Sequence, residues 1–176
     1  MSFTIRQGLP KDVQAILDLI IELAVFEKEP NAVEITKEDL LIDGFSQKPK
    51  FRLFVAEEEN IIIGMALFYE RYSTCKGKTI HLEDLIVTQQ KRALGVGKAL
   101  YRAVLKYAYD HNFNRVAWEV LDWNTNAIEF YKSTGATYLS GWHVVQMTKE
   151  NLAKFISEEL LEDLNISPEK FWIGFE

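Results

Sequence analysis

Two neighbouring carboxylates, Glu83 and Asp84, stand shortly before a loop that contains two glycines, Gly95 and Gly97. A carboxylate can take a proton from a reacting group or attract a cation. Glycines at the start of a helix let the chain turn so that unpaired backbone N–H groups face outward, and such groups bind phosphate. One short stretch therefore combines a candidate acid–base group with a candidate phosphate site, which indicates chemistry.

Hydrophobic spacing predicts the elements that hold these residues. Residues 80–87 nearly alternate apolar and polar side chains and include β-branched residues, which is typical of a strand. From Val96 to Tyr107 apolar residues recur every three or four positions, which is typical of an amphipathic helix. The phosphate-binding groups would then lie at the N-terminus of this helix, where the helix dipole is positive.

The loop between strand and helix reads Arg-x-x-Gly-x-Gly, from Arg92 to Gly97. The dinucleotide-binding pattern requires a third glycine where Leu100 stands, and the P-loop pattern requires Ser or Thr where Ala99 follows Lys98. Both patterns are therefore excluded. The glycines could also serve only to form the turn, so the loop alone leaves a binding role and a structural role open.

Composition restricts the class of protein. The chain of 176 residues is 48% hydrophobic and 12% aromatic, which predicts one globular domain, residues 1–176, with a sizeable core. Its net charge of −6 argues against nucleic-acid binding, and we expect neither a membrane-spanning run nor a signal peptide. A single cysteine, Cys75, permits no intrachain disulfide and indicates a cytoplasmic location. The three histidines lack metal-ligand spacing, so we expect no metal.

The remaining elements follow from the same patterns of apolar residues, breakers and caps. Strands are predicted at 3–6, 51–56, 61–72, 115–121, 137–140 and 142–147, and helices at 10–27, 36–45, 124–131 and from 148 to about 160. The nearly continuous apolar strand at 115–121 follows a helix, so it should run parallel to its neighbour. The order of elements predicts an α/β (α+β) fold with a mixed central sheet.

A second informative stretch runs from Asn124 to Lys132 and reads Asn-Thr-Asn-Ala-Ile-Glu-Phe-Tyr-Lys. Asn124 could simply cap a helix, and Phe130 and Tyr131 could be core aromatics. Taken together with the loop before it, however, this stretch resembles the GNAT N-acetyltransferases. In that family a Gln/Arg-x-x-Gly-x-Gly/Ala loop holds acyl-CoA, an asparagine holds the pantetheine arm, and a tyrosine hydroxyl lies near the thioester sulfur.

The resemblance narrows to the diamine acetyltransferase branch, which includes the spermidine/spermine acetyltransferases and the thialysine acetyltransferase. It rests on His81-Leu-Glu-Asp84, Phe130-Tyr-Lys132 and similar short motifs, and covers about residues 4–155. It implies a mostly antiparallel sheet of about seven strands, splayed between strands 4 and 5, flanked by helices. It also implies acetyl-CoA as cosubstrate and a homodimer. The extension 156–176 has no counterpart in the pattern, and its role stays open.

The chemistry of acetyl transfer gives two of these residues catalytic roles. An amine must be neutral to attack a thioester, yet a primary ammonium has a pKa of about 10.4. The resemblance therefore assigns Glu83 as the general base, acting directly or through water. It assigns Tyr131 as the general acid that protonates the departing thiolate.

The resemblance also implies a set of binding residues. Acetyl-CoA would be held by backbone pairing along the strand, by the loop and by the second stretch: Leu85, Ile86, Val87, Arg92, Gly95, Val96, Gly97, Lys98, Asn124 and Lys132. A cationic acceptor would be attracted by three carboxylates: Glu22, Glu27 and Asp84.

The sequence predicts the reaction more narrowly than it predicts the amine that accepts the acetyl group. The polyamine branch has arginine where this chain has Asp18, and tryptophan where it has Cys75. Short diamines, polyamines, thialysine-like amino acids and other amines therefore stay open. Two alternative functions also stay open, a protein or peptide N-acetyltransferase and a non-catalytic acyl-CoA sensor, although a sensor would not need Glu83 and Tyr131.

Overall fold

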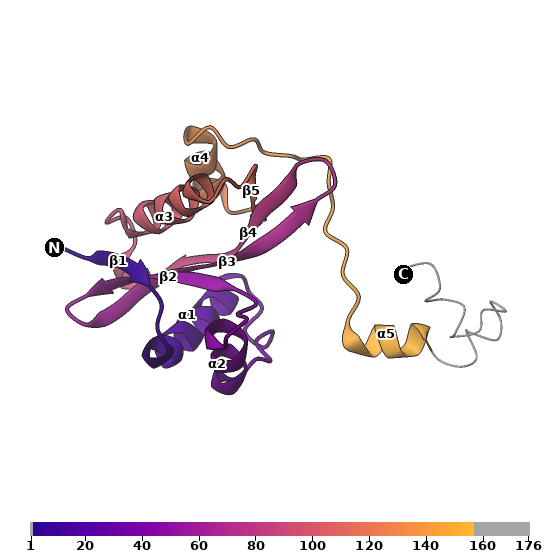
Figure 1. Cartoon of the computed structure of the whole chain (residues 1–176), viewed down its shortest axis with the longest axis horizontal. Coiled ribbons are helices and arrows are strands. Elements are labelled where there is room, and N and C mark those ends of the chain that lie inside the picture. Colours follow the sequence, from indigo (N-terminus) through magenta and orange to yellow (C-terminus); the bar gives the residue numbers. More distant parts are fainter. Residues whose placement is uncertain (1, 157–176) are drawn as a thin grey trace. The chain divides into compact units, whose positions relative to one another are not determined.

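A computed structural model describes residues 2–156 of the chain. The chain divides into two compact units, Met1–Ile128 and Glu129–Glu176. The first unit contains one five-stranded sheet with the strand order β1-β2-β3-β4-β5 (Figure 1). All neighbouring strands are antiparallel except β4 and β5, which are parallel. The strands are β1 (Thr4–Gln7), β2 (Arg52–Glu58), β3 (Ile61–Ser73), β4 (Gly77–Val87) and β5 (Val116–Ala117).

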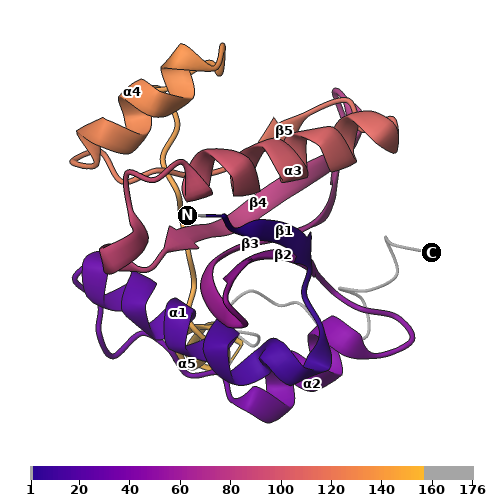
Figure 2. The ribbon, with the colours of Figure 1, turned by 90° about the vertical axis from the view of Figure 1, so that its left-hand side faces the viewer.

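Helices cover both faces of this sheet. Figure 2 shows α1 and α2 on one face and α3 on the other. The helical elements are η1 (Pro10–Asp12), α1 (Val13–Phe26), α2 (Lys37–Phe45), η2 (Gln89–Lys91), α3 (Val96–Asp110), α4 (Thr125–Ser133) and α5 (Lys149–Phe155). Between residues 2 and 156, no helix combines the length and the apolar character that a bilayer span requires.

Each face of the sheet has its own core, because successive residues of a strand point to opposite faces. Val55, Met65 and Ile86 pack with α1 and α2 residues such as Ile16. On the other face, Phe68 packs against α3, its ring centroid 5.1 Å from that of Tyr107. The mixed sheet with helices on both sides confirms the predicted fold class.

Glycine is required at one position between these layers. A Cβ atom on Gly64 of β3 would lie 2.8 Å from the Ile86 carbonyl oxygen and 3.2 Å from Leu100 Cδ1. The first distance is shorter than real Cβ contacts allow, so a larger residue would push β3 and β4 apart. Gly64 therefore lets these strands approach at the end of β4 that leads to the loop.

The predicted strands after the first unit are wrong. The sequence patterns predict strands at 137–140 and 142–147, but neither segment is a strand in the structure, and the sheet has five strands where about seven were expected. Leu139, Trp142 and Val145 are exposed at 65%, 81% and 90%. Alternating apolar residues form a strand only against a partner edge, and no such pairing occurs within residues 2–156. The strand predicted at 115–121 is also shorter in the structure, where β5 consists of Val116–Ala117.

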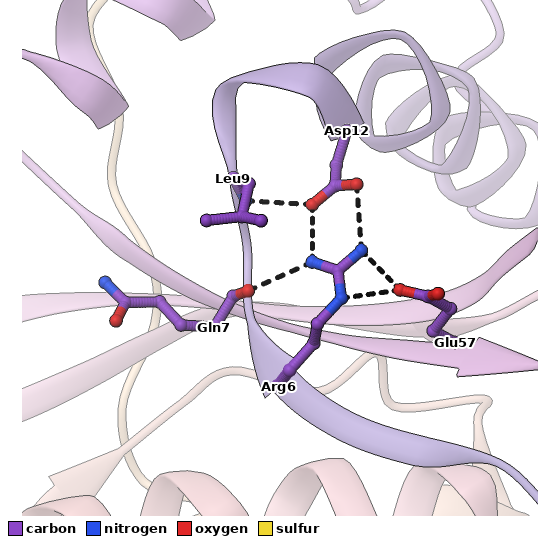
Figure 3. A network of polar contacts seen from close by, with 5 residues as sticks. All are labelled: Arg6, Gln7, Leu9, Asp12 and Glu57. Atoms are coloured by element: carbon purple, nitrogen blue, oxygen red, sulfur yellow. Dashed lines mark hydrogen bonds and ion pairs between the residues drawn. The ribbon is translucent and has the colours of Figure 1, made fainter. Parts of the chain in front are cut away.

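A charged network joins β1, β2 and the start of α1 (Figure 3). Arg6 donates two hydrogen bonds to Asp12, at 2.6 and 3.0 Å, and one to Glu57 at 2.5 Å. The backbone N–H of Leu9 donates to the same Asp12 at 2.8 Å. Asp12 is buried, and the hydrogen bonds from Arg6 hold the pKa of its carboxyl below the usual range.

We expect Arg6→Met to lower the free energy of unfolding by about 2 kcal/mol, because Asp12 would stay buried without its cation. Urea denaturation at pH 7 measures the change. Since the pKa of Asp12 is lowered in the folded state, the wild-type contribution is present above its ordinary value of 3.8 and is lost as the pH falls further. Asp12→Asn in the Arg6→Met background should restore part of the loss. An unchanged urea midpoint in Arg6→Met would show that solvent screens the network.

Candidate active site

Glu83 lies at a β-bulge in β4. Leu67 of β3 is opposite Asp84, whereas the next β3 residue, Phe68, is opposite Leu82, so Glu83 is an extra residue in the ladder. A bulge bends its strand and turns a side chain away from the regular alternation. The side chain of Glu83 is 51% exposed. The strand therefore presents this carboxylate to solvent in the middle of an otherwise largely buried element.

The edge of β4 opens at the same position. The parallel neighbour β5 pairs with β4 only at Ile80–Val116 and His81–Ala117. Beyond His81, the outer edge of β4 has no partner strand within the described part of the chain. This separation of the fourth and fifth strands confirms the predicted splay.

Two hydrogen bonds show which backbone groups face the open edge. The Thr88 N–H donates to the Ile63 carbonyl of β3 at 3.0 Å, so the backbone N–H of Thr88 faces β3. The Val87 carbonyl instead accepts from the Arg92 side chain at 2.9 Å, so the backbone carbonyl of Val87 faces away from β3, toward the open edge. Because backbone direction alternates along a strand, the N–H and C=O groups of Leu85 also face outward, and those of Ile86 face β3.

The loop after β4 ends in a helix start suited to an anion. Gly95 is the N-cap of α3 with φ of 83°, and a Cβ there would meet nothing within 4 Å. Ala99 makes the first helical bond, donating to the Gly95 carbonyl at 3.0 Å. The N–H groups of Val96, Gly97 and Lys98 precede this bond and point out of the helix end, where the dipole is positive.

Arg92 and Glu22 brace this loop. Arg92 lies over the ring of Phe26, with 5.0 Å between its guanidinium carbon and the ring centroid, in addition to its bond to Val87. Glu22 of α1 lies 3.5 Å from the Arg92 guanidinium and accepts a bond from the Gln89 backbone N–H at 2.8 Å. These contacts join the end of α1 to the end of β4. The roles predicted for Arg92 in phosphate binding and for Glu22 in substrate binding stay predictions.

Two carboxylates, Glu83 and Glu27, act on a third, Asp84, beside the bulge. Burial, followed by the charges of Glu83 and Glu27, raises the pKa of Asp84 to about 6. Glu27 is the C-cap of α1, and partial desolvation raises its pKa as well. The group combines acidic charge with a carboxyl that titrates near neutral pH. Such a group can attract a cation and can exchange a proton under physiological conditions.

Two ring residues next to Glu83 were not among the predicted site residues. His81 Nε2 lies 3.4 Å from Glu83 Oε2. Burial, followed by the charge of Glu83 and a hydrogen bond to its carboxylate, raises the pKa of Tyr69. His81 could have been noticed from the sequence, because it lies two residues before Glu83 on one strand. Tyr69 could not, because only the pairing of β3 with β4 places it opposite His81.

Comparison with known proteins decides the class. Residues 15–136 match the sequence profile of the Acetyltransferase (GNAT) family. The chain belongs to the GNAT acetyltransferase family. It is 36% identical over 157 residues to the thialysine N-epsilon-acetyltransferase of Bos taurus, covering 83% of this chain and 92% of that protein. It is 35% identical over 167 residues to the spermidine/spermine N(1)-acetyltransferase-like protein 1 of Homo sapiens, covering 89% of this chain and 24% of that protein.

A solved structure supports the fold of this acetyltransferase. An integron cassette protein from the mobile metagenome of V. cholerae superposes with a TM-score of 0.72 at 24% identity, covering 88% of this chain and 98% of that protein. The family assignment and the named relatives together identify the protein as an N-acetyltransferase. Enzymes of this family use acetyl-CoA as cosubstrate. The open edge of β4 could hold its pantetheine arm, and the N–H groups at the start of α3 could hold its phosphates.

The second stretch of the predicted site, residues 124–132, forms α4 and the residue that caps it. Asn124 caps α4, because its side-chain oxygen accepts from the Ala127 N–H at 3.3 Å, and its amide keeps N–H donors for a ligand. In the second unit, the ring of Tyr131 is half-buried, 5.4 Å from that of Phe130. Lys132 lies 3.0 Å from a Glu129 carboxylate oxygen. The roles of Tyr131 and Lys132 toward substrate stay predictions.

Proposed function

We propose that this acetyltransferase transfers the acetyl group of acetyl-CoA to the primary amine of a small cationic acceptor. The acceptor is a diamine or polyamine, or a thialysine-like amino acid, and it attacks the thioester directly. One observation carries the proposal: Glu83 stands at a bulge on an open strand edge, with Asp84 beside it and the glycine loop and the start of α3 at the end of the same strand. The proposed base, the carboxylate that would attract the cation and the proposed acetyl-CoA site thus all lie on β4 or at its end.

The donor half of the site follows from the backbone. The pantetheine arm would add to the outer edge of β4 through Leu85 and Val87, as an extended peptide adds to a sheet. The Asn124 amide would hold the arm, and the N–H groups at the start of α3 would hold the pyrophosphate. An outward N–H on β4 would donate to the thioester oxygen as negative charge develops on it.

The acceptor half of the site follows from the carboxylates. Asp84 and Glu27 attract the ammonium, and Glu83 takes one proton from it, directly or through water. The neutral amine then forms a bond to the thioester carbon, and the carbon–sulfur bond breaks. The thiolate of coenzyme A leaves and takes a proton from the Tyr131 hydroxyl, and the second proton of the acylated nitrogen passes through water to the Tyr131 phenolate, which restores the phenol. The products are the N-acetylated amine and coenzyme A.

Two features support an acceptor of this class. The bovine relative is named for an amino acid and the human relative for polyamines, and both kinds of acceptor carry a primary ammonium on a flexible chain. Asp18 and Cys75 depart from the polyamine branch, which weighs against spermidine and leaves shorter diamines and thialysine-like amino acids as acceptors. We also propose that the enzyme works as a homodimer in the cytoplasm, which analytical ultracentrifugation and fractionation of its host cell would check.

The deciding experiment measures thiol release from acetyl-CoA with spermidine, putrescine, thialysine, lysine and a basic peptide. Turnover with thialysine or lysine and none with polyamines would assign the amino acid, and the reverse pattern would assign the diamine branch. Turnover with the peptide alone would favour a protein acetyltransferase. No thiol release with any amine of the panel, together with acetyl-CoA binding in calorimetry, would favour a non-catalytic acyl-CoA sensor.

Tyr131→Phe should lower kcat by about 10- to 100-fold, because the thiolate would leave without a proton donor. The KM for acetyl-CoA should change little, since the phenol acts on the leaving sulfur only after the bond begins to break. Steady-state rates from pH 6 to pH 10 test this. Tyr109→Phe, at an 84% exposed position on α3, serves as the control. Unchanged turnover of Tyr131→Phe at every pH would exclude the acid role.

A further inference from the structure

His81 contacts the proposed base but takes no part in the proposed steps of acetyl transfer. Its Nε2 atom lies 3.4 Å from Oε2 of Glu83. The residue is only 8% exposed, and its ring lies 5.2 Å from the ring of Tyr69 between centroids. The imidazole is therefore held by packing, whereas the Glu83 side chain beside it is half exposed. A packed ring next to a half-exposed carboxylate can restrain it.

The other ring nitrogen indicates the protonation pattern. His81 Nδ1 is buried and has no hydrogen-bond partner within residues 2–156. A carboxylate can only accept, so a nitrogen that donates to Glu83 must carry the hydrogen. A neutral imidazole carries one N–H. If that hydrogen is on Nε2, Nδ1 carries a lone pair and is an acceptor. A buried acceptor without a partner is tolerated more often than a buried N–H without an acceptor. The burial of Nδ1 and the contact of Nε2 thus agree on one tautomer.

We propose that His81 is a positioning residue for Glu83: its Nε2–H holds Oε2, so that Oε1 is left to take the proton of the acceptor ammonium. This inference rests on the proposed role of Glu83 as the base. An unrestrained glutamate must lose rotamer freedom before each proton transfer, and small misplacements of a catalytic group lower the rate strongly. Tyr69, which lies opposite His81 on β3, packs against the other side of the imidazole and keeps it in place.

Two substitutions separate positioning from packing. His81→Phe keeps an aromatic ring against Tyr69 but removes the N–H, and we expect kcat to fall about 10- to 100-fold with the KM for acetyl-CoA within about twofold of wild type. His81→Gln places an amide N–H at about the reach of Nε2 and should recover most of kcat. His111→Phe, at the exposed C-cap of α3, is the matched control. If His81 were only a core residue, His81→Phe would change the unfolding midpoint and leave kcat unchanged.

A double-mutant cycle tests whether His81 acts through Glu83. In the Glu83→Gln background, His81→Phe should change kcat by less than about twofold, because the group that it positions no longer takes a proton. Effects that multiply instead would overturn the proposal. If Glu83→Gln alone kept full activity, the proposed base would be wrong, and the positioning role would fail with it.

A spectroscopic measurement is independent of turnover. Long-range ¹H–¹⁵N correlation spectra of the free enzyme report the tautomer of each histidine, and His81→Gln identifies the His81 signals. We expect the Nε2–H form in wild type and a shifted Nε2 resonance in Glu83→Gln. An Nδ1–H form, or signals unaffected by Glu83→Gln, would overturn the contact. The expected spectra together with no acetylation of any amine would refute the proposed function and retain the His81–Glu83 contact.

Discussion

Glu83→Gln is expected to lower kcat by about 10²- to 10⁴-fold at neutral pH, which is the usual contribution of a positioned general base. The amide keeps the shape of the side chain but cannot take the proton of the acceptor ammonium, whose pKa is about 10.4. The KM for acetyl-CoA should stay close to wild type, because the loop and the start of α3 are unchanged. Steady-state kinetics with the best amine of the panel measure both constants.

The pH dependence of Glu83→Gln provides the internal check. As the pH rises toward the pKa of the acceptor, a growing fraction of the amine is neutral without help, so the variant should recover relative to wild type. Glu59→Gln, in the exposed turn between β2 and β3, is the control. Full activity of Glu83→Gln at pH 7 would move the base to another carboxylate. Asp84, with a pKa of about 6, would then be the candidate.

Asp84→Asn is expected to stabilise the protein by up to about 3 kcal/mol while weakening binding of the cationic acceptor. The pKa of Asp84 is raised from 3.8 to about 6 in the folded state, so its ionised form opposes folding. This penalty is fully present above pH 6, shrinks as the pH falls and vanishes below about 3.8. Asparagine removes the charge, so its advantage should be largest at neutral pH.

Urea denaturation of wild type and Asp84→Asn at pH 7.5, 5 and 3.5 tests the stability effect, and the KM for the acceptor tests the second effect. The acceptor KM should rise about tenfold or more, because a close charge pair in a partly buried site contributes on the order of 1.5 kcal/mol or more. Asp110→Asn, on the exposed end of α3, is the control. An unfolding free energy that changes equally at all three pH values would show that charge burial is not the cause.

Several features of the fold could be predicted from the sequence because nearby residues determine them. The Thr36 cap is one example: its hydroxyl accepts from the Asp39 N–H at 3.2 Å while Asp39 accepts from the Thr36 N–H at 2.8 Å. The β2–β3 hairpin and the strand, glycine loop and helix around Gly95 are others. Each depends on residues within a few positions of one another, where spacing is informative.

The features that escaped prediction depend on residues far apart in the chain. The bulge at Glu83 exists only relative to β3, so the strand pattern alone does not reveal it. Arg92 matches the predicted loop motif, yet its contacts with Val87 and Phe26 follow from how the loop folds back on α1. Alternating apolar residues likewise indicate a strand at 142–147, but whether a strand forms depends on a partner edge.

The extra residue at Glu83 also determines which changes in chain length the strand can accept. Before Glu83, the outward backbone groups belong to even-numbered residues, as the bond from the Ile80 N–H to the Arg115 carbonyl shows; after it, they belong to odd-numbered residues such as Val87. Deleting one residue within this segment would restore a regular ladder and turn the Val87 carbonyl toward β3, away from Arg92. Segments exchanged with a related enzyme must therefore join outside β4, or carry the extra residue with them.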